Sequence, residues 1–125
     1  MNEKIQQLLN AIEQDRSISA EIKERKKVHV ISLVEKAVLY VEKVVKQSAQ
    51  IQMTAGQQDR DTMETLAKMD ASRSIAHDSF IAEINIVNRF CAEYSINAVY
   101  EGKNERRQQG DFALQLVTQY FCDRI

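Results

Sequence analysis

Apolar residues recur along the chain at the three- and four-residue spacing of helices. The first positions that share one helical face are Ile5, Leu8, Leu9 and Ile12. Asn2 stands directly before them and is of a residue type that caps helix N-termini. We therefore expect a short first helix. A polar loop follows at residues 15–19, in which Ser17 or Ser19 caps the next helix.

A long segment from about residue 20 to residue 53 is rich in valine and has helical periodicity. Wound at about 100° per residue, its small apolar residues gather on one side. These residues are Val30, Val34, Ala37, Val41, Val44 and Val45. A strand would alternate every two residues and would not run this far. The segment is therefore predicted to be a helix despite its β-branched content, stabilised by packing rather than by propensity.

The third helix is predicted over residues 61–96. Gly56 is placed to end the preceding helix as a left-handed residue, and Asp59 or Asp61 can cap the new one. Small and polar residues gather at positions 70–74, where the helix can break.

Gly102 marks the next connection. A final helix then begins near Asn104, or at Asp111 if Gly110 interrupts it, and runs to the carboxyl terminus.

The chain has no Pro and only three Gly among 125 residues, which leaves few turns for a β fold. We therefore expect an all-α helical bundle of four to five helices, forming a single domain over residues 1–125. It is built on a long central antiparallel helical hairpin, each arm about 50 Å long. Shorter helices would cover such a hairpin poorly. The remaining apolar surface predicts a homodimer, or a protein partner that buries it.

Composition narrows the class of protein. Hydrophobic residues make up 44% and charged residues 28%, which is typical of a globular chain. Seventeen basic residues oppose 18 acidic ones, so no overall charge favours phosphate binding. No apolar run approaches a membrane span and the amino terminus lacks a signal-peptide pattern, so we expect a cytoplasmic protein. Cys91 and Cys122 are then interpreted as reduced core thiols.

Four polar residues lie on or beside the apolar face of the third helix: Asp70, Arg73, His77 and Asn88. Arg73 falls near the middle of that face, and a buried arginine is costly unless it is paired. Asp70 and His77 lie three residues before it and four residues after it, within reach along a helix. These four residues are the candidate binding cluster. It can be structural, joining two helices, or it can bind an anion or a partner's carboxylate; catalysis is a third alternative.

Metal-dependent hydrolysis is a weaker interpretation. Some helical phosphohydrolases hold a metal with a His, an adjacent His-Asp pair and a distant Asp, and this chain contains His29, His77, Asp78 and Asp111 in that order. Adjacent residues on a continuous helix point about 100° apart, so one metal could bind both only where the helix is distorted. No cofactor motif is present, and we expect no cofactor.

Two basic clusters, at residues 23–27 and 103–107, leave nucleic-acid binding open. Both clusters contain Glu, and such binding would require them side by side on one face. The sequence therefore favours a non-enzymatic protein–protein interaction or regulatory protein. A nucleic-acid-binding regulator and a metal-dependent hydrolase are the alternatives.

Overall fold

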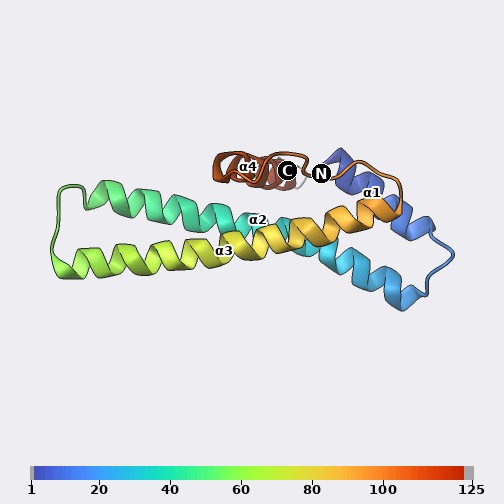
Figure 1. The fold of residues 1–125 in the computed structure, drawn as a ribbon, viewed down its shortest axis with the longest axis horizontal. Coiled ribbons are helices and arrows are strands. Elements are labelled where there is room, and N and C mark those ends of the chain that lie inside the picture. The colour runs from blue at the N-terminus through green and yellow to red at the C-terminus, as the bar shows by residue number, and fades with distance from the viewer. Residues whose placement is uncertain (1, 123–125) are drawn as a thin grey trace.

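Within residues 2–122, the protein is an all-α chain of four helices. The computed structural model describes residues 2–122, and this range contains no strand. The helices are α1 (Glu3–Gln14), α2 (Ala20–Met53), α3 (Arg60–Glu93) and α4 (Arg106–Cys122). Figure 1 shows α2 and α3 running antiparallel as a long hairpin, with α1 and α4 placed beside it. The predicted fold class and its central hairpin are confirmed.

Three helices begin at side-chain caps. Asn2 Oδ1 accepts hydrogen bonds from the backbone of Lys4 and Ile5 at the start of α1. Ser19 Oγ accepts from Ile22 N at 3.2 Å, and Asp59 Oδ2 accepts from Thr62 N at 3.0 Å. Each cap satisfies backbone N–H groups that have no partner inside the helix. Of the alternative caps in the sequence, Ser19 and Asp59 are the ones used.

The two long helices differ from the prediction only in α3. Helix α2 ends at Met53 as expected, and α3 is continuous through residues 70–74, where the sequence left a break open. An ion pair along the helix, from Arg73 to Asp70, spans this stretch. Helix α3 also ends at Glu93 rather than Ile96. The break that the sequence allowed does not form, because small and polar residues are accommodated in a helix that neighbouring packing stabilises.

The end of α3 is a Schellman motif. Ile96 N donates to Cys91 O at 2.8 Å and Ser95 N donates to Ala92 O at 3.2 Å. Ser95 has φ 56°, a left-handed conformation that glycine adopts more readily. Gly56 also has a left-handed φ, 84°, but it lies two residues beyond the C-cap Thr54 rather than directly after it.

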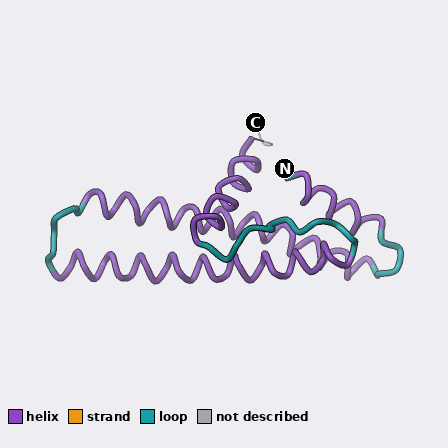
Figure 2. Tube along the Cα trace, turned by 45° about the horizontal axis from the view of Figure 1, so that its top comes forward, coloured by secondary structure: helices purple, strands orange, loops and turns teal. Residues whose placement is uncertain are grey.

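Helix α4 begins at Arg106, between the two starts that the sequence allowed. Gly110 lies inside the helix without interrupting it. Residues 123–125, to which the predicted helix extends, lie outside the described residues. Figure 2 shows the connection of residues 94–105 running back along the hairpin, so that α4 starts near the middle of the hairpin.

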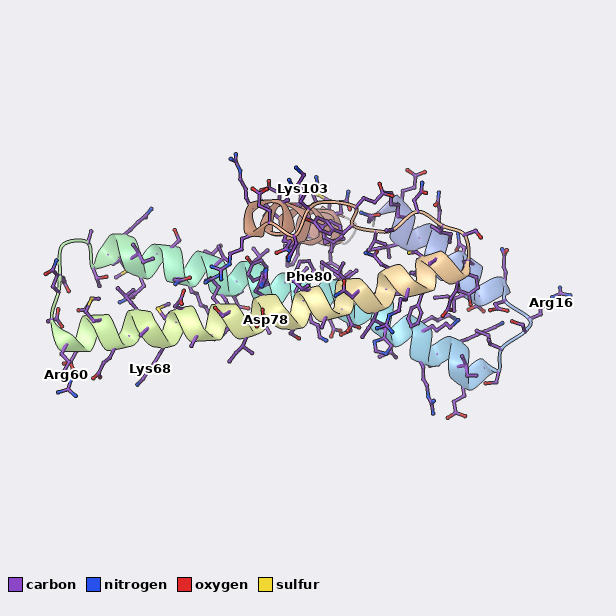
Figure 3. The ribbon with its side chains drawn as sticks, viewed as in Figure 1. Arg16, Arg60, Lys68, Asp78, Phe80 and Lys103 are labelled. Carbon is purple, nitrogen blue, oxygen red and sulfur yellow. The ribbon has the colours of Figure 1, made fainter. Side chains whose placement is uncertain are left out.

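The hydrophobic core lies where α1 and α4 cover the hairpin. It contains Ile5, Leu8, Ile12, Val30, Leu33, Val34, Ala37, Tyr40, Ala76, Phe80, Ile84, Val87, Cys91, Val99, Phe112, Ala113 and Leu116. Phe80 is fully buried at its centre (Figure 3), with its ring centroid 6.0 Å from those of Tyr40 and Phe112. Stacked rings from three helices therefore hold α2, α3 and α4 together.

The other half of the hairpin has no core. We call residues 41–75 the distal hairpin, and every residue in it is half-buried or exposed. Arg60 and Lys68 extend outward from its α3 side (Figure 3). Isolated helices of this length are marginally stable in water, so the distal hairpin relies on α2 packing against α3 and on continuity with the covered half.

Side-chain hydrogen bonds connect the turn between α1 and α2, and the first part of α2, to the end of α3. Tyr94 donates its hydroxyl proton to Asp15 Oδ2 at 2.6 Å, and Lys26 Nζ donates to the same hydroxyl and to Glu93. The Ser17 hydroxyl is the largest cause of a lowered Asp15 pKa, followed by the Tyr94 hydroxyl and the Ser17 backbone; together they lower this pKa from 3.8 to about 2.

We expect Ser95→Gly to raise the free energy of unfolding by about 0.5–1 kcal/mol, because glycine adopts the left-handed conformation without strain. Chemical denaturation measures the change. Ser74→Gly, inside α3, is the control and should lose about 0.5 kcal/mol through helix propensity. A loss in both variants would contradict the role assigned to Ser95.

The lowered Asp15 pKa makes stability depend on pH. The ionised carboxylate contributes fully above the unfolded pKa of 3.8, and this contribution is lost as pH falls toward about 2. We therefore expect Asp15→Asn to flatten the stability profile between about pH 4 and pH 2, measured by thermal melting. Tyr94→Phe, which leaves both Ser17 bonds, should flatten it only in part. An Asp15→Asn profile parallel to that of the wild type would refute this linkage.

Candidate functional site

Asp70 and Arg73 form one of three separate polar contacts along α3. Arg73 donates to Asp70 Oδ1 at 3.0 Å, and Gln47 from α2 donates to the same oxygen at 3.1 Å. The Arg73 side chain is only 12% exposed, close to the predicted burial, whereas Asp70 is exposed. The Arg73 guanidinium, with Gln47, lowers the pKa of the Asp70 carboxyl. The Asp70–Arg73 pair lies within α3, and the hydrogen bond from Gln47 to Asp70 joins α2 to α3 at the boundary of the distal hairpin.

His77 contacts α4 rather than Arg73. Its Nε2 lies 2.7 Å from Gln109 Oε1, and Gln109 Nε2 donates to Asn104 Oδ1 at 2.9 Å. Gln109 is almost fully buried, so its amide must be satisfied by protein partners. The ring of His77 also packs edge-on against Tyr40. His77 therefore connects α2, α3 and the start of α4.

The side chain of Asn88 forms hydrogen bonds with the loop of residues 94–105. Its Oδ1 accepts from Val99 N at 3.0 Å and its Nδ2 donates to Tyr100 O at 3.2 Å. Both ends of the amide are therefore used by the backbone of one loop. The four predicted residues do not converge on one point: Asp70 and Arg73 form one contact, His77 a second and Asn88 a third.

A buried carboxylate is the polar feature that the sequence analysis missed. Glu83 is 3% exposed on its side chain, and it contacts His29 Nδ1 at 2.8 Å and Lys36 Nζ at 3.1 Å. Both partners lie on α2, so the contact joins the two arms of the hairpin inside the covered half. Glu83 lies three residues after Phe80 and four before Val87, and this spacing alone could have predicted its burial.

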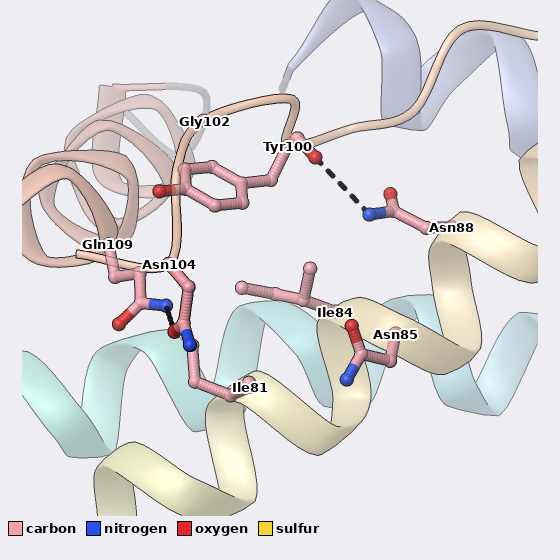
Figure 4. Close-up of a pocket in the computed structure, with 8 residues that line it drawn as sticks. All are labelled: Ile81, Ile84, Asn85, Asn88, Tyr100, Gly102, Asn104 and Gln109. Carbon is pink, nitrogen blue, oxygen red and sulfur yellow. Dashed lines mark hydrogen bonds between the residues drawn. The ribbon is translucent and has the colours of Figure 1, made fainter. Parts of the chain in front are cut away.

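A cavity of about 370 Å³ lies between α3, α4 and the loop that joins them (Figure 4). It is lined by Ile81, Ile84, Asn85, Asn88, Tyr100, Gly102, Asn104 and Gln109. The Tyr100 hydroxyl donates to Lys103 O at 2.6 Å, and its ring lies against that of Phe112 at 5.1 Å. A Cβ at Gly102 would stand 2.6 Å from the Tyr100 ring, so only glycine allows this close approach.

The residues of the metal hypothesis have other contacts. His29 contacts Glu83, and His77 contacts Gln109 and the neighbouring Asp78. Within residues 2–122, no group of three His, Cys, Asp or Glu side chains is placed to hold a metal ion. The geometry therefore provides nothing that favours the hydrolase alternative.

The two basic clusters are not side by side. Lys23 and Lys27 contact Glu13, and Lys26 contacts Glu93, all near the start of α2. Arg106 and Arg107 line a groove beside Val44 and Val45 in the distal hairpin, roughly 25 Å further along α2. This separation gives no support to a continuous nucleic-acid-binding face.

The two cysteines differ. Cys91 is a free, fully buried thiol, as predicted, and burial raises its pKa. Cys122 is free but exposed, so its prediction as a core residue was wrong. The last turn of α4 extends past the hairpin surface that covers Phe112 and Leu116, and nothing in the local sequence signals this. Among the described residues, no helix is long and apolar enough to span a membrane.

We expect Glu83→Gln to lower the free energy of unfolding by about 1–3 kcal/mol, because it removes the buried carboxylate that His29 Nδ1 and Lys36 Nζ contact. Urea denaturation measures the loss. Glu35→Gln, at an exposed position on α2, is the matched control and should stay within about 0.5 kcal/mol of the wild type. Equal effects in the two variants would mean that the buried pair adds nothing.

Comparison with known proteins places the chain in a family. Residues 3–124 match the model of a family described as Protein of unknown function (DUF3232). No curated protein and no solved structure matches the chain. The family description assigns no activity to any residue. Because the match spans almost the whole sequence, the chain belongs to the DUF3232 family.

Proposed function

We propose that the protein is a non-enzymatic helical interaction protein that associates with a second copy of itself through the distal hairpin. The observation that carries this proposal is the absence of any buried residue between positions 41 and 75. The sequence nevertheless provides apolar side chains there. The exposed large apolar side chains in this range are Val44, Val45, Ile51, Met53, Met63 and Ile75. Exposed apolar side chains gathered in one region are typical of an interaction surface.

The shape of the distal hairpin suits a second copy. Two antiparallel helices expose a long apolar seam, and two such pairs packed face to face form a four-helix bundle. The arm of α2 beyond residue 41 extends for about 20 Å, which allows several helical turns of contact. A closed dimer with a two-fold axis would bury the same surface on both copies and leave none for further growth.

The charges of the distal hairpin are self-complementary. Residues 41–58 contain one Glu and two Lys, a net charge of +1, and residues 59–75 contain four acidic and three basic residues, a net charge of −1. In an antiparallel pairing, the α2 arm of one copy would face the α3 arm of the other. Opposite net charges would then meet and like charges would stay apart. A strongly acidic or basic partner would find no such match.

Sedimentation equilibrium on the whole protein tests the proposal. We expect twice the mass of the chain at micromolar to millimolar concentration, and a monomer for the double variant Val45→Glu, Ile51→Glu with its helical content unchanged. Val45 and Ile51 are 60% and 50% exposed, so two glutamates there should be compatible with the folded chain but oppose an apolar interface.

Val28→Glu is the matched control. Val28 is 55% exposed on α2 but lies outside the distal hairpin, so this variant should remain dimeric. A wild-type mass equal to one chain at every concentration would overturn self-association. Loss of the dimer in Val28→Glu alone would assign the interface to the other half of α2.

A further inference from the structure

The cavity between α3, α4 and residues 94–105 is separate from the distal hairpin, and its surrounding loop is held in place. Helix–helix connections in bundles usually have two to eight residues, and longer ordered loops are commonly functional. Here Asn88 anchors Val99 and Tyr100, and Gln108 Oε1 accepts from Lys103 N at 2.9 Å. Both halves of the loop are therefore fixed, and the cavity is formed before any ligand arrives.

The cavity lining is polar without being charged. None of its residues carries a formal charge, so an ionised ligand would lose hydration without gaining a counter-charge. Asn104 receives a hydrogen bond on Oδ1 from Gln109, while its Nδ2 has no partner among residues 2–122. The amide of Asn85 has no hydrogen-bond partner in the same part of the chain. These groups offer an unused acceptor and several unused donors.

The apolar walls favour a flat molecule. Figure 4 shows the Tyr100 ring on one side of the cavity and Ile84 on the opposite side, with Asn104 and Gln109 at one end and Asn85 near the other. A planar molecule between the ring and the aliphatic wall would bury both of its faces and keep its edge available to the amides. At about 370 Å³, the cavity lies at the small end of ligand-binding sites.

We propose that this cavity binds a small, neutral, planar molecule that presents a carbonyl beside an N–H group, the edge found in pyrimidine bases and cyclic amides. The ligand carbonyl would accept from the Asn104 or Asn85 NH₂ group, and its N–H would donate to Asn85 Oδ1. Specificity would come from the paired donor and acceptor, because a ligand that lacks either group would form fewer hydrogen bonds with the amides of Asn85 and Asn104.

Uracil is a suitable probe, followed by the side-chain amide resonances of the full-length protein in NMR titration. We expect saturable shifts of the Asn85 and Asn104 NH₂ signals, with a Kd of about 1 mM. 1,3-Dimethyluracil keeps both carbonyls but has no N–H, so it should bind about three- to tenfold more weakly.

Asn85→Ala removes an exposed side chain without a protein partner, so this variant should fold normally and bind uracil about three- to tenfold more weakly. Asn97→Ala, another exposed Asn outside the cavity lining, is the matched control and should bind uracil as the wild type does. Absence of saturable shifts up to about 10 mM uracil, or equal affinity in wild type and Asn85→Ala, would overturn the proposal. The Val45→Glu, Ile51→Glu variant should retain binding, which separates this site from self-association.

Discussion

The length of the two central helices is the constraint on which the rest of the structure depends. Helices α2 and α3 have 34 residues each, whereas α1 has 12 and α4 has 17. The shorter helices cover only part of the hairpin, so the core ends at Tyr40 on one arm and begins again at Ala76 on the other. The difference in helix length therefore divides the hairpin into a covered half and an uncovered half. The covered half contains the core, and the uncovered half presents its apolar side chains to solvent.

Polar contacts fix how the covered half is assembled. Glu83 joins α3 to His29 and Lys36 of α2, His77 joins α3 to α4 through Gln109, and Asn88 holds the intervening loop. Apolar packing is largely non-directional, whereas a buried amide or carboxylate tolerates few arrangements. No buried side-chain nitrogen or oxygen in residues 2–122 lacks a partner. We infer that these contacts select one register of α4 among several that the apolar faces would allow.

The loop of residues 94–105 determines the position of both surfaces for which we propose a function, the distal hairpin and the cavity. By running back along the hairpin, it places the start of α4 beside Val44 and Val45 and so fixes where coverage stops. The same loop forms one wall of the polar cavity, with the Tyr100 ring held against Phe112.

The sequence by itself determined the helices, because helical periodicity and capping are local properties of the chain. The helix over residues 20–53 and a serine cap at position 17 or 19 could be predicted from spacing and residue type alone, and the cap used is Ser19. The tertiary structure decided which partners the polar side chains have on other helices: Gln47 of α2 meets Asp70, His77 meets Gln109, and Glu83 contacts His29 and Lys36 of α2. It also decided that Cys122 is exposed. These outcomes depend on where separate helices cross, and no spacing within one helix contains that information.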